Sequence, residues 1–334
     1  MNTRIFAPWA ILGLLAVSFP ASAAEEVVVY SARNEQLIRP LFEAYTKETG
    51  IKVRFITDKE GPLLVRLKAE GPSTPADLFI TVDAGNLWLA AKEGVLAKVD
   101  SPVLMQNIPV HLRDPGQRWF GLSVRARTIV YHTGRVKPAE LSTYEALGDP
   151  QWKGRLCLRT SKKNYNQSLV AMMIARQGEA GTEAVVRRWV ANLATDVFAS
   201  DNQVMEAILA GQCDVGIVNS YYYGRLMKKK PGSAIALYWP NQKTSGAHVN
   251  ISGAGITTHA KHKAAAQKLL EWLSSPAAQN LFADGNLEYP VNPKVQPAPI
   301  VAAWGRFHQD RTNLAEAGRL QVQAVKLMDR AGYR

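Results

Sequence analysis

The sequence predicts an α/β protein with two lobes. Strand-like apolar runs alternate with amphipathic helices along its first third, which is the order of βα units on a mainly parallel sheet. The chain has 334 residues. Even without the first 23, it is longer than most chains that fold around a single hydrophobic core, so we expect two lobes. Two extended stretches, near residues 123–130 and 240–250, are the predicted crossings between the lobes.

The first 23 residues have the pattern of a secretory signal peptide. Arg4 supplies the positive start, residues 9–19 form a short apolar segment, and Ala21-Ser22-Ala23 fits the small-x-small cleavage site. This segment is too short to span a bilayer, and no later run of the sequence is long and apolar enough to do so. We therefore expect export to the periplasm, with a mature chain that starts at Ala24.

The chain is basic, with a formal net charge of +12. Such a balance often indicates nucleic-acid binding. Here the Lys and Arg residues are dispersed, and the one tight run, Lys228-Lys229-Lys230, falls at the end of a predicted helix. We expect no nucleic-acid partner. A site that gathers several anionic ligands would need nearby cationic side chains, and this explains the positive net charge better than nucleic-acid binding does.

The two cysteines, Cys157 and Cys213, each lie beside a strand-like apolar run. In an oxidising compartment, a disulfide between them would tie two strands of one lobe together. Two buried free thiols are the alternative, and the spacing has no catalytic pattern. The sequence leaves both states open.

The elements of the first lobe follow from apolar periodicity and from helix stop signals. Each strand leads into a helix, and residues 31–34 form the turn after the first strand. In order, we expect a strand at 26–30, a helix ending at Gly50, a strand at 51–57, a helix opening at Gly61-Pro62, a strand at 76–82 and a helix at 86–93.

Residues 119–131 form a long extended stretch that carries Arg125 and Arg127. Because side chains alternate along a strand, both arginines fall on one face. Arginine on a strand face is usually a surface salt-bridge partner, whereas a pair that points into a cleft is a carboxylate or carbonate site.

The remaining elements belong mostly to the second lobe. We expect strands at 156–158, 197–199, 215–218 and 248–256, a polar return at 238–246, and helices at 169–176, 181–194, 201–210, 264–274, 277–282 and from 299 onward. The polar residues 159–168 lead into the helix at 169–176, whose free backbone N–H groups favour an anion.

The stretch that organises the second lobe runs from the strand at 215–218 into Tyr221-Tyr222-Tyr223. Asn219 and Ser220 are N-cap residue types, so Tyr221 opens a helix at the carboxyl end of a strand. Ligands bind at such strand ends in open α/β sheets. Neighbouring residues there diverge by about 100°, yet two phenols can still converge in a cleft. The alternative is an aromatic cluster packed between helices.

Several short segments, in a fixed order, carry a resemblance to a known family. They are Val29-Tyr30-Ser31, Pro75-Ala76-Asp77-Leu78, Thr81-Val82-Asp83-Ala84-Gly85, Val124-Arg125-Ala126-Arg127, Tyr165-Asn166-Gln167-Ser168-Leu169, Asn219-Ser220-Tyr221-Tyr222, His248-Val249-Asn250-Ile251-Ser252-Gly253 and Glu288-Tyr289-Pro290-Val291-Asn292-Pro293. With them the mature chain resembles the periplasmic ferric-ion-binding proteins of ABC iron-uptake systems.

The resemblance implies the two-lobed class II periplasmic binding-protein fold, with a mixed sheet in each lobe and a two-strand hinge. On this basis we divide the chain into a signal peptide and two lobes. The signal peptide is 1–23, the N-terminal lobe is 24–124 plus 249–300, and the C-terminal lobe is 125–248 plus 301–334.

The resemblance also implies a set of iron ligands. In the family, ferric iron is held by tyrosines that match Tyr165 and the adjacent pair Tyr221 and Tyr222. Tyr223 falls on a position that other members fill with assorted residues, so we expect it to be a packing residue.

First-lobe ligands differ among the family's members. Some add a histidine from the first strand-to-helix turn, where this chain has Asn34, and some add a glutamate after the third strand, where it has Val82-Asp83. This departure indicates the sub-class that binds iron with tyrosines plus a synergistic anion, carbonate or bicarbonate. Asn34 remains the candidate contact from the first lobe.

Elementary chemistry supports this ligand set. Ferric iron is a hard trivalent cation that prefers anionic oxygen donors. A tyrosine, with a pKa of about 10, loses its proton only with help from the bound cation. Three phenolates would neutralise the ion, and Arg125, Arg127 and the Ser161 hydroxyl could hold a carbonate that completes the shell. The six histidines show no metal-ligand pairing.

We therefore predict a monomeric periplasmic binding protein, not an enzyme, that delivers ferric iron to an inner-membrane ABC permease. Another small solute, such as a phosphonate or a polyamine, is the alternative cargo. The three tyrosines argue against it, because anion sites need donors and polyamine sites need acidic clusters. An exported enzyme is the third hypothesis, but the sequence has no nucleophile elbow, histidine–carboxylate metal motif or P-loop.

Overall fold

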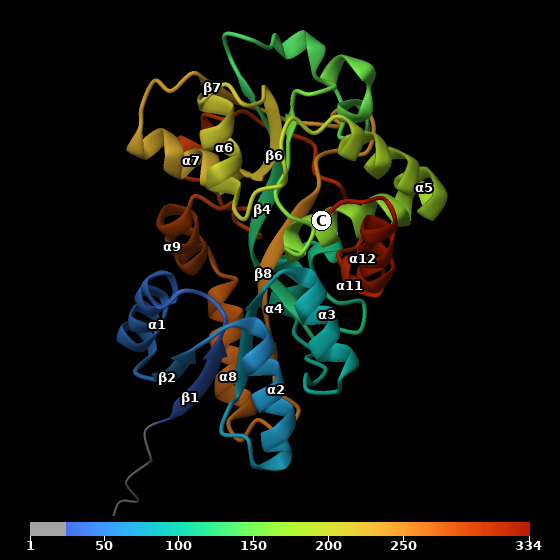
Figure 1. Cartoon of the computed structure of the whole chain (residues 1–334). Coiled ribbons are helices and arrows are strands. Elements are labelled where there is room, and N and C mark those ends of the chain that lie inside the picture. Colours follow the sequence, from blue (N-terminus) through green and yellow to red (C-terminus); the bar gives the residue numbers. More distant parts are fainter. Residues whose placement is uncertain (1–24) are drawn as a thin grey trace, which may run out of the picture.

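Two α/β lobes lie on either side of a pair of long strands in the computed structural model, which describes residues 25–334 (Figure 1). This arrangement confirms the predicted two-lobed fold with mixed sheets and a two-strand hinge. The predicted signal peptide lies outside the described residues. Among residues 25–334, none of the helices has the length and apolar character needed to cross a membrane.

The sheet of the first lobe has the strand order β2-β1-β3-β8-β4. Strand β1 pairs in parallel with β2 and β3, and β8 pairs antiparallel with β3 and β4. The bounds are β1 Glu26–Ser31, β2 Lys52–Thr57, β3 Leu78–Val82, β4 Phe120–His132 and β8 Val249–Ile256.

The sheet of the second lobe is built on the far half of β4. Up to Ala126, β4 pairs with β8, and from Arg127 onward it pairs with β6 and β7. Strand β5 adds a parallel partner to β6. Strand β4 is therefore shared by both lobes, and its change of partner marks the hinge. The bounds are β5 Leu156–Cys157, β6 Val215–Asn219 and β7 Ile235–Tyr238.

Helices cover both sheets. Those on the first lobe are α1 Glu35–Thr49, α2 Glu60–Glu70, α3 Ala84–Lys92, α4 Pro102–Asn107, α8 Lys263–Leu273, α9 Pro276–Asn286 and α10 Pro299–Ala302. Those on the second lobe are α5 Asn164–Ala191, α6 Asp201–Leu209, α7 Ser220–Lys229 and α12 Gln321–Arg330. Helix α11, Ala315–Arg319, lies between the lobes.

Alternation along β4 gives the second lobe two hydrophobic clusters. Ile129 belongs to the cluster that contains the core-facing residues of α5 and α12, and Val130 belongs to the cluster that contains those of α6. Since successive strand residues point to opposite faces, the second sheet is covered on both sides. The first lobe has one continuous cluster.

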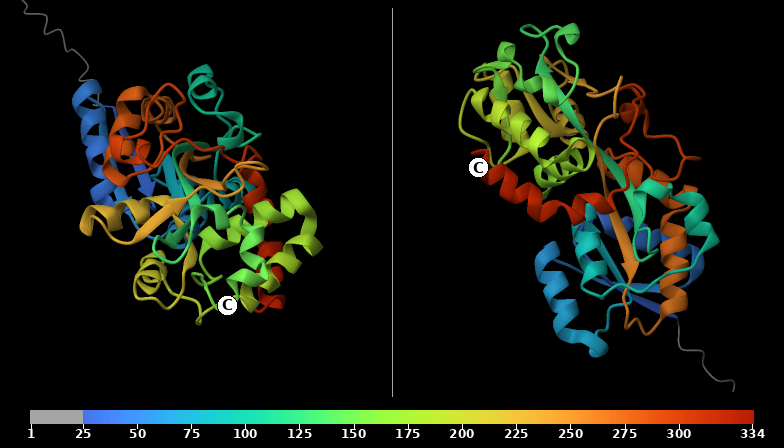
Figure 2. Two further views of the ribbon diagram at one scale, coloured as in Figure 1. Left: turned by 90° about the horizontal axis from the view of Figure 1, so that it is seen from above. Right: turned by 90° about the vertical axis from the view of Figure 1, so that its right-hand side faces the viewer.

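The C-terminal helices connect the two lobes. Helix α11 packs against α3 of the first lobe and α5 of the second, and α12 continues along α5 (Figure 2, right-hand view). At Gly318 an added Cβ would come 2.4 Å from the Trp88 Cβ, so only glycine permits this approach. Leu314 and Ala317 lie in the first-lobe cluster, whereas α12 packs on the second lobe. The predicted domain boundaries remain predictions.

One local prediction needs correction, and one strand was not predicted. The strand expected at 197–199 does not form. Within it only Phe198 is paired, in an isolated parallel bridge with Arg159. The two helices expected at 169–176 and 181–194 are present as the two halves of α5, which are separated by a kink at Gly178, where φ is +79°. Strand β7 was not predicted from the sequence; it pairs with β4 and ends at Tyr238, where the predicted polar return begins.

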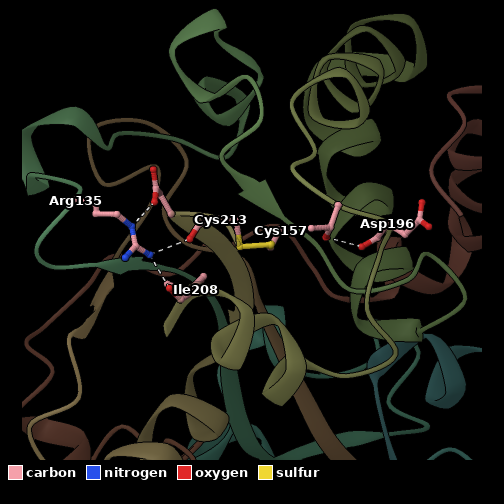
Figure 3. The surroundings of a disulfide bond; sticks show 7 residues. Arg135, Cys157, Asp196, Ile208 and Cys213 are labelled. Atoms are coloured by element: carbon pink, nitrogen blue, oxygen red, sulfur yellow. Dashed lines mark hydrogen bonds and ion pairs between the residues drawn. A yellow bond between two sulfur atoms is a disulfide. The ribbon is translucent and has the colours of Figure 1, made fainter. Parts of the chain in front are cut away.

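Cys157 and Cys213 form a disulfide, which is one of the two states that the sequence leaves open (Figure 3). Cys157 lies in β5, and Cys213 lies two residues before β6. The bond therefore links β5 to the segment that leads into its parallel neighbour β6. Beside it, the Arg135 guanidinium donates to the carbonyl oxygens of Ile208 and Cys213, at 2.6 and 3.1 Å. The disulfide therefore closes a long loop at the edge of the second lobe.

We expect the double variant Cys157→Ala/Cys213→Ala to unfold more easily. The bond joins residues 56 apart, and a loop of that size stabilises the fold by about 4 kcal/mol in the chain-entropy account. Urea unfolding of both proteins measures the loss. Reduction should bring the wild type close to the variant and leave the variant unchanged. Equal urea midpoints under oxidising conditions would contradict this.

Candidate metal centre

A cleft of about 450 Å³ lies between the lobes. The second lobe contributes three phenols to its lining, those of Tyr165, Tyr221 and Tyr222. The first lobe contributes the turn after β1 and the segment after α9, and Arg125 of β4 lies between the two sets. The predicted tyrosine ligands thus line one site.

The phenols meet because two parallel strands end at the same edge of the second sheet. Tyr165 is the second residue of α5, which follows β5, and Tyr221 lies in the first turn of α7, which follows β6. Since β5 and β6 are parallel neighbours, both helices begin at one edge. This is the strand-end position that the sequence predicts for Tyr221.

The three phenols converge closely. The hydroxyl oxygens of Tyr165 and Tyr221 are 3.5 Å apart. The ring centroids of Tyr221 and Tyr222 are 4.3 Å apart. Tyr221 is buried, while Tyr165 and Tyr222 are partly exposed to the cleft. A single ion could therefore contact several phenol oxygens at once.

Burial raises the pKa of Tyr221 well above its ordinary value, and the neighbouring phenols Tyr165 and Tyr222 raise it further. Without a cation the Tyr221 phenol is therefore neutral at physiological pH. A bound metal ion supplies the positive charge that removes such a proton. Coordination of a cation by the Tyr221 oxygen would therefore begin with proton loss.

Four cationic side chains surround the phenols. The charged ends of Arg125, Arg159 and Lys163 lie 5.3, 5.5 and 5.2 Å from the centre of the Tyr165 ring. Arg225 lies 5.1 and 5.8 Å from the rings of Tyr221 and Tyr222. Such a surrounding favours phenolates and small anions over free metal cations.

Arg125 lines the cleft and has two buried donors without a partner in the described part of the chain. Its side chain is 2% exposed, and its Nη1 donates to the Ser252 hydroxyl at 3.2 Å. Its Nε and Nη2 have no partner among residues 25–334. Those two groups form the edge of a guanidinium that binds a planar oxyanion through two parallel hydrogen bonds.

The charge of Arg125 is secured by its neighbours. Burial alone would lower its pKa, but the phenols of Tyr165 and Tyr221 and the carboxylate of Glu288 outweigh this and raise the pKa. The guanidinium is therefore cationic at every physiological pH.

A buried ion pair forms the first-lobe wall of the cleft. Arg33 Nη1 contacts Glu288 Oε2 at 3.1 Å, and it also donates to the hydroxyls of Ser123 and Ser252. Burial would raise the pKa of the Glu288 carboxyl, but Arg33 and Arg125 hold it below the ordinary value. Glu288 is thus ionised and compensates the buried guanidinium groups.

The wall continues to the second lobe. The Glu288 carboxylate accepts a hydrogen bond from the Asn286 side-chain amide at 2.7 Å, and the Asn286 Oδ1 accepts one from Arg225 of α7. Sequence reasoning missed Arg33, Glu288 and Arg225 as site residues. Arg225 could have been found, because it follows Tyr221 by four residues on a helix and so shares its face.

Arg127 requires a correction. The sequence pairs it with Arg125 as an anion donor, but its guanidinium lies inside the second lobe and does not line the cleft. It donates to Asp201, Asn166, Asn219 and the carbonyl of Ile217. Four bonds within the protein leave it little capacity to hold a carbonate.

The other predicted site residues are divided. Asn34 lies at the exposed end of the turn after β1 and lines the cleft from the first lobe. Ser161 does not line it; its backbone N–H donates to the carbonyl of Arg334, and its carbonyl accepts from Gln167. Tyr223 points away and stacks edge-on against Trp304, with 5.9 Å between ring centroids.

Metal ligands of other kinds do not gather in the described part of the chain. Residues 25–334 contain no group of three or more His, Cys, Asp and Glu side chains that could hold a metal ion. None of the histidines lines the cleft. Any metal bound there would rely on the phenols.

Comparisons with known proteins agree with this geometry. Residues 27–285 match the bacterial extracellular solute-binding protein family. The chain is similar to Iron uptake protein A1 of Synechocystis sp., with 41% identity that covers 93% of this chain and 88% of that one. It is 31% identical to the Fe(3+)-binding periplasmic protein of Serratia marcescens, with 93% and 92% covered. A solved Trichodesmium protein, IdiA or FutA in complex with iron and citrate ligands, is 42% identical with a TM-score of 0.90, and the match covers 92% of this chain and all of that one.

The Arg33–Glu288 pair generates a pH-dependent prediction. Because the folded-state pKa of Glu288 is depressed, the stability it adds is fully present above its ordinary pKa of 4.5 and is lost as the pH falls through the lower folded value. Glu288→Gln leaves a buried guanidinium without its carboxylate and should cost about 3–5 kcal/mol at pH 7.

Urea unfolding at a series of pH values measures this cost. The difference between wild type and Glu288→Gln should shrink as the pH falls below 4.5. Glu179→Gln, which breaks an exposed pair with Arg330, serves as the control and should leave the midpoint nearly unchanged. A difference independent of pH would contradict the assignment of Glu288 as an ionised partner.

Proposed function

The chain belongs to the bacterial extracellular solute-binding protein family, and we propose that it captures ferric iron in the periplasm for an ABC permease. The similar proteins from Synechocystis and Serratia carry iron-uptake and ferric-binding names. The observation that carries the proposal is the convergence of three phenols on one cleft beside the unpartnered edge of Arg125.

Tyr165, Tyr221 and Tyr222 are the proposed iron ligands. Three phenolates balance the charge of a ferric ion, which prefers anionic oxygen donors. The raised pKa of Tyr221 suits this role, because only a strongly charged cation displaces its proton and weaker cations leave it in place. The free energy needed to remove the phenol proton therefore favours a trivalent ion over ions of lower charge.

Carbonate is the proposed synergistic anion, and Arg125 is its proposed anchor. The Nε and Nη2 groups can donate to two carbonate oxygens, as guanidinium groups do with carboxylates. The third carbonate oxygen, alone or together with one of the other two, would then face the metal. Arg127 and Ser161 are left out of this proposal because neither lines the cleft.

Most of the proposed ligands belong to the second lobe. The metal can therefore be held before the lobes close, and Asn34 is the first-lobe residue that would approach it on closure. A shell completed by phenolates and carbonate has no open coordination position, which suits carriage of the metal and not catalysis. We propose that the protein works as a monomer and hands its cargo to the permease.

The first test concerns the tyrosines. Tyr221→Phe and Tyr222→Phe should each abolish the red phenolate-to-iron charge-transfer colour. Each should also weaken ferric binding by more than about 100-fold, the upper end of what losing an outer-shell partner costs. Tyr223→Phe is the matched control, because its ring packs on Trp304 outside the cleft. Absorbance and competition with a chelator measure both effects. Equal losses in all three variants would refute the ligand assignment.

The second test concerns pH and bicarbonate. Each phenol that must lose a proton makes ferric affinity fall by roughly tenfold per pH unit as the pH decreases, because proton release and metal binding are linked. Bicarbonate should strengthen binding in the wild type and have much less effect in Arg125→Ala.

Arg187→Ala, on the outer side of α5, is the control for this test and should respond to bicarbonate as the wild type does. Ferric affinity is measured across mildly acidic pH, with and without bicarbonate. An affinity that ignores both variables would rule out a site of tyrosinates and carbonate.

A further inference from the structure

Arg127 is the most thoroughly bonded side chain next to the proposed iron site, yet it does not line the cleft. Its side chain is 1% exposed and forms an ion pair with Asp201, which is fully buried, at 2.9 Å. Replacing a buried ion pair by apolar residues is often neutral or stabilising, so stability alone does not explain the pair. Its other contacts indicate what else it does.

One set of contacts leads to the start of α5. Arg127 Nη2 donates to the Asn166 Oδ1 at 2.6 Å. The amide of Asn166 in turn donates to the carbonyls of Arg159 and Thr160, at 2.8 and 3.0 Å. These bonds fix both the segment before α5 and its first turn. Tyr165 immediately precedes Asn166, so its position is set by them.

A second set leads to the start of α7. Arg127 Nη1 donates to Asn219 Oδ1 at 3.3 Å, and Nη2 donates to the carbonyl of Ile217 at 3.0 Å. Asn219 directs its amide Nδ2 to the Tyr221 hydroxyl at 3.4 Å. Its backbone N–H donates to Asp201 at 2.9 Å, which closes the network.

Direct pairing between β5 and β6 ends before the two helix starts. Strands β5 and β6 pair through two residue pairs, and the last is Cys157 with Gly216. Beyond that point β6 stays paired with β4 as far as Asn219, whereas the chain after β5 continues for several residues before it reaches Tyr165. The spacing of the phenols therefore depends on side-chain contacts past the end of the sheet.

We propose, given the proposed ferric-binding function, that Arg127 is a positioning residue that sets the distance between Tyr165 and Tyr221. It does so through Asn166 and Asn219, one at the start of each helix. Asn219 adds a hydrogen bond to the Tyr221 oxygen, which orients that phenol toward the metal position. Asp201 balances the buried charge and fixes the guanidinium plane.

The role requires an arginine. A guanidinium has five donors in a fixed planar fork, so one group can bind a carboxylate and two amides at once. A lysine ammonium in the same place could keep the charge pair with Asp201. It could not reach Asn166 and Asn219 together with defined geometry.

The test compares three network variants. Arg127→Lys keeps the charge, while Asn166→Leu and Asn219→Leu leave the Arg127–Asp201 pair intact and each release one helix start. Leu327→Ala is the control, because it removes a buried side chain from the second-lobe core beside α5 and lowers stability without touching the network. Tyr222→Phe reports loss of a proposed ligand.

Ferric affinity, the charge-transfer maximum and the urea midpoint are measured for every variant. We expect each network variant to bind iron about 10–100-fold more weakly, as for other outer-shell partners of metal ligands, and to shift the charge-transfer band. Leu327→Ala should lower the midpoint but keep the wild-type band and affinity. Asn166→Leu and Asn219→Leu decide the matter if Arg127→Lys does not fold.

Wild-type affinity and an unshifted band in folded Asn166→Leu and Asn219→Leu would overturn the positioning role and leave the proposed function standing. An equal loss in Leu327→Ala would overturn it too, since general destabilisation would then explain the effect. A wild-type protein that binds no ferric iron would remove the proposed function and this inference together.

Discussion

The structure depends on one strand that belongs to two sheets. Strand β4 changes its pairing partner between Ala126 and Arg127, and this change divides the molecule into two lobes. The strand itself is continuous, so it connects the two lobes. The two arginines on either side of that point have different surroundings. Arg125 lies in the wall of the cleft, and Arg127 lies inside the second lobe. The hinge, the proposed anion anchor and the proposed positioning residue thus share a few residues of backbone.

Compensation of buried charge organises the cleft. The guanidinium groups of Arg33, Arg125 and Arg127 are nearly inaccessible, and each has a carboxylate nearby, either Glu288 or Asp201. The phenols beside them are different, because burial keeps the Tyr221 proton in place until a cation arrives. Without a bound cation the Tyr221 phenol therefore adds no negative charge to the cleft. On the proposed function, binding a trivalent ion would create the phenolates that neutralise it, so metal capture would release protons.

The contacts between the lobes are distributed over two sides of the cleft. On one side α11 fits between α3 and α5, and the Ser168 hydroxyl of the second lobe donates to Asp83 of the first, at 2.8 Å. On the other side Arg225 reaches Asn286 and, through it, Glu288. The second contact involves an exposed side chain and lies at the mouth of the site, so it is the easier of the two to break.

The sequence by itself determined most of the elements and the place of Tyr221 and Tyr222 after a strand, whereas Tyr165 was singled out by the family resemblance. Apolar periodicity located most strands and helices, and N-cap residue types placed Tyr221 at the start of a helix after a buried strand, because these signals are local in the chain. It did not determine what each polar side chain faces. Arg125 and Arg127 look equivalent by alternation, and Glu288 lies far from Arg33 in sequence. Only the tertiary structure decided that one arginine meets the cleft, that the other meets Asp201, and that Glu288 closes the wall, because burial and partners are set by contacts between distant segments.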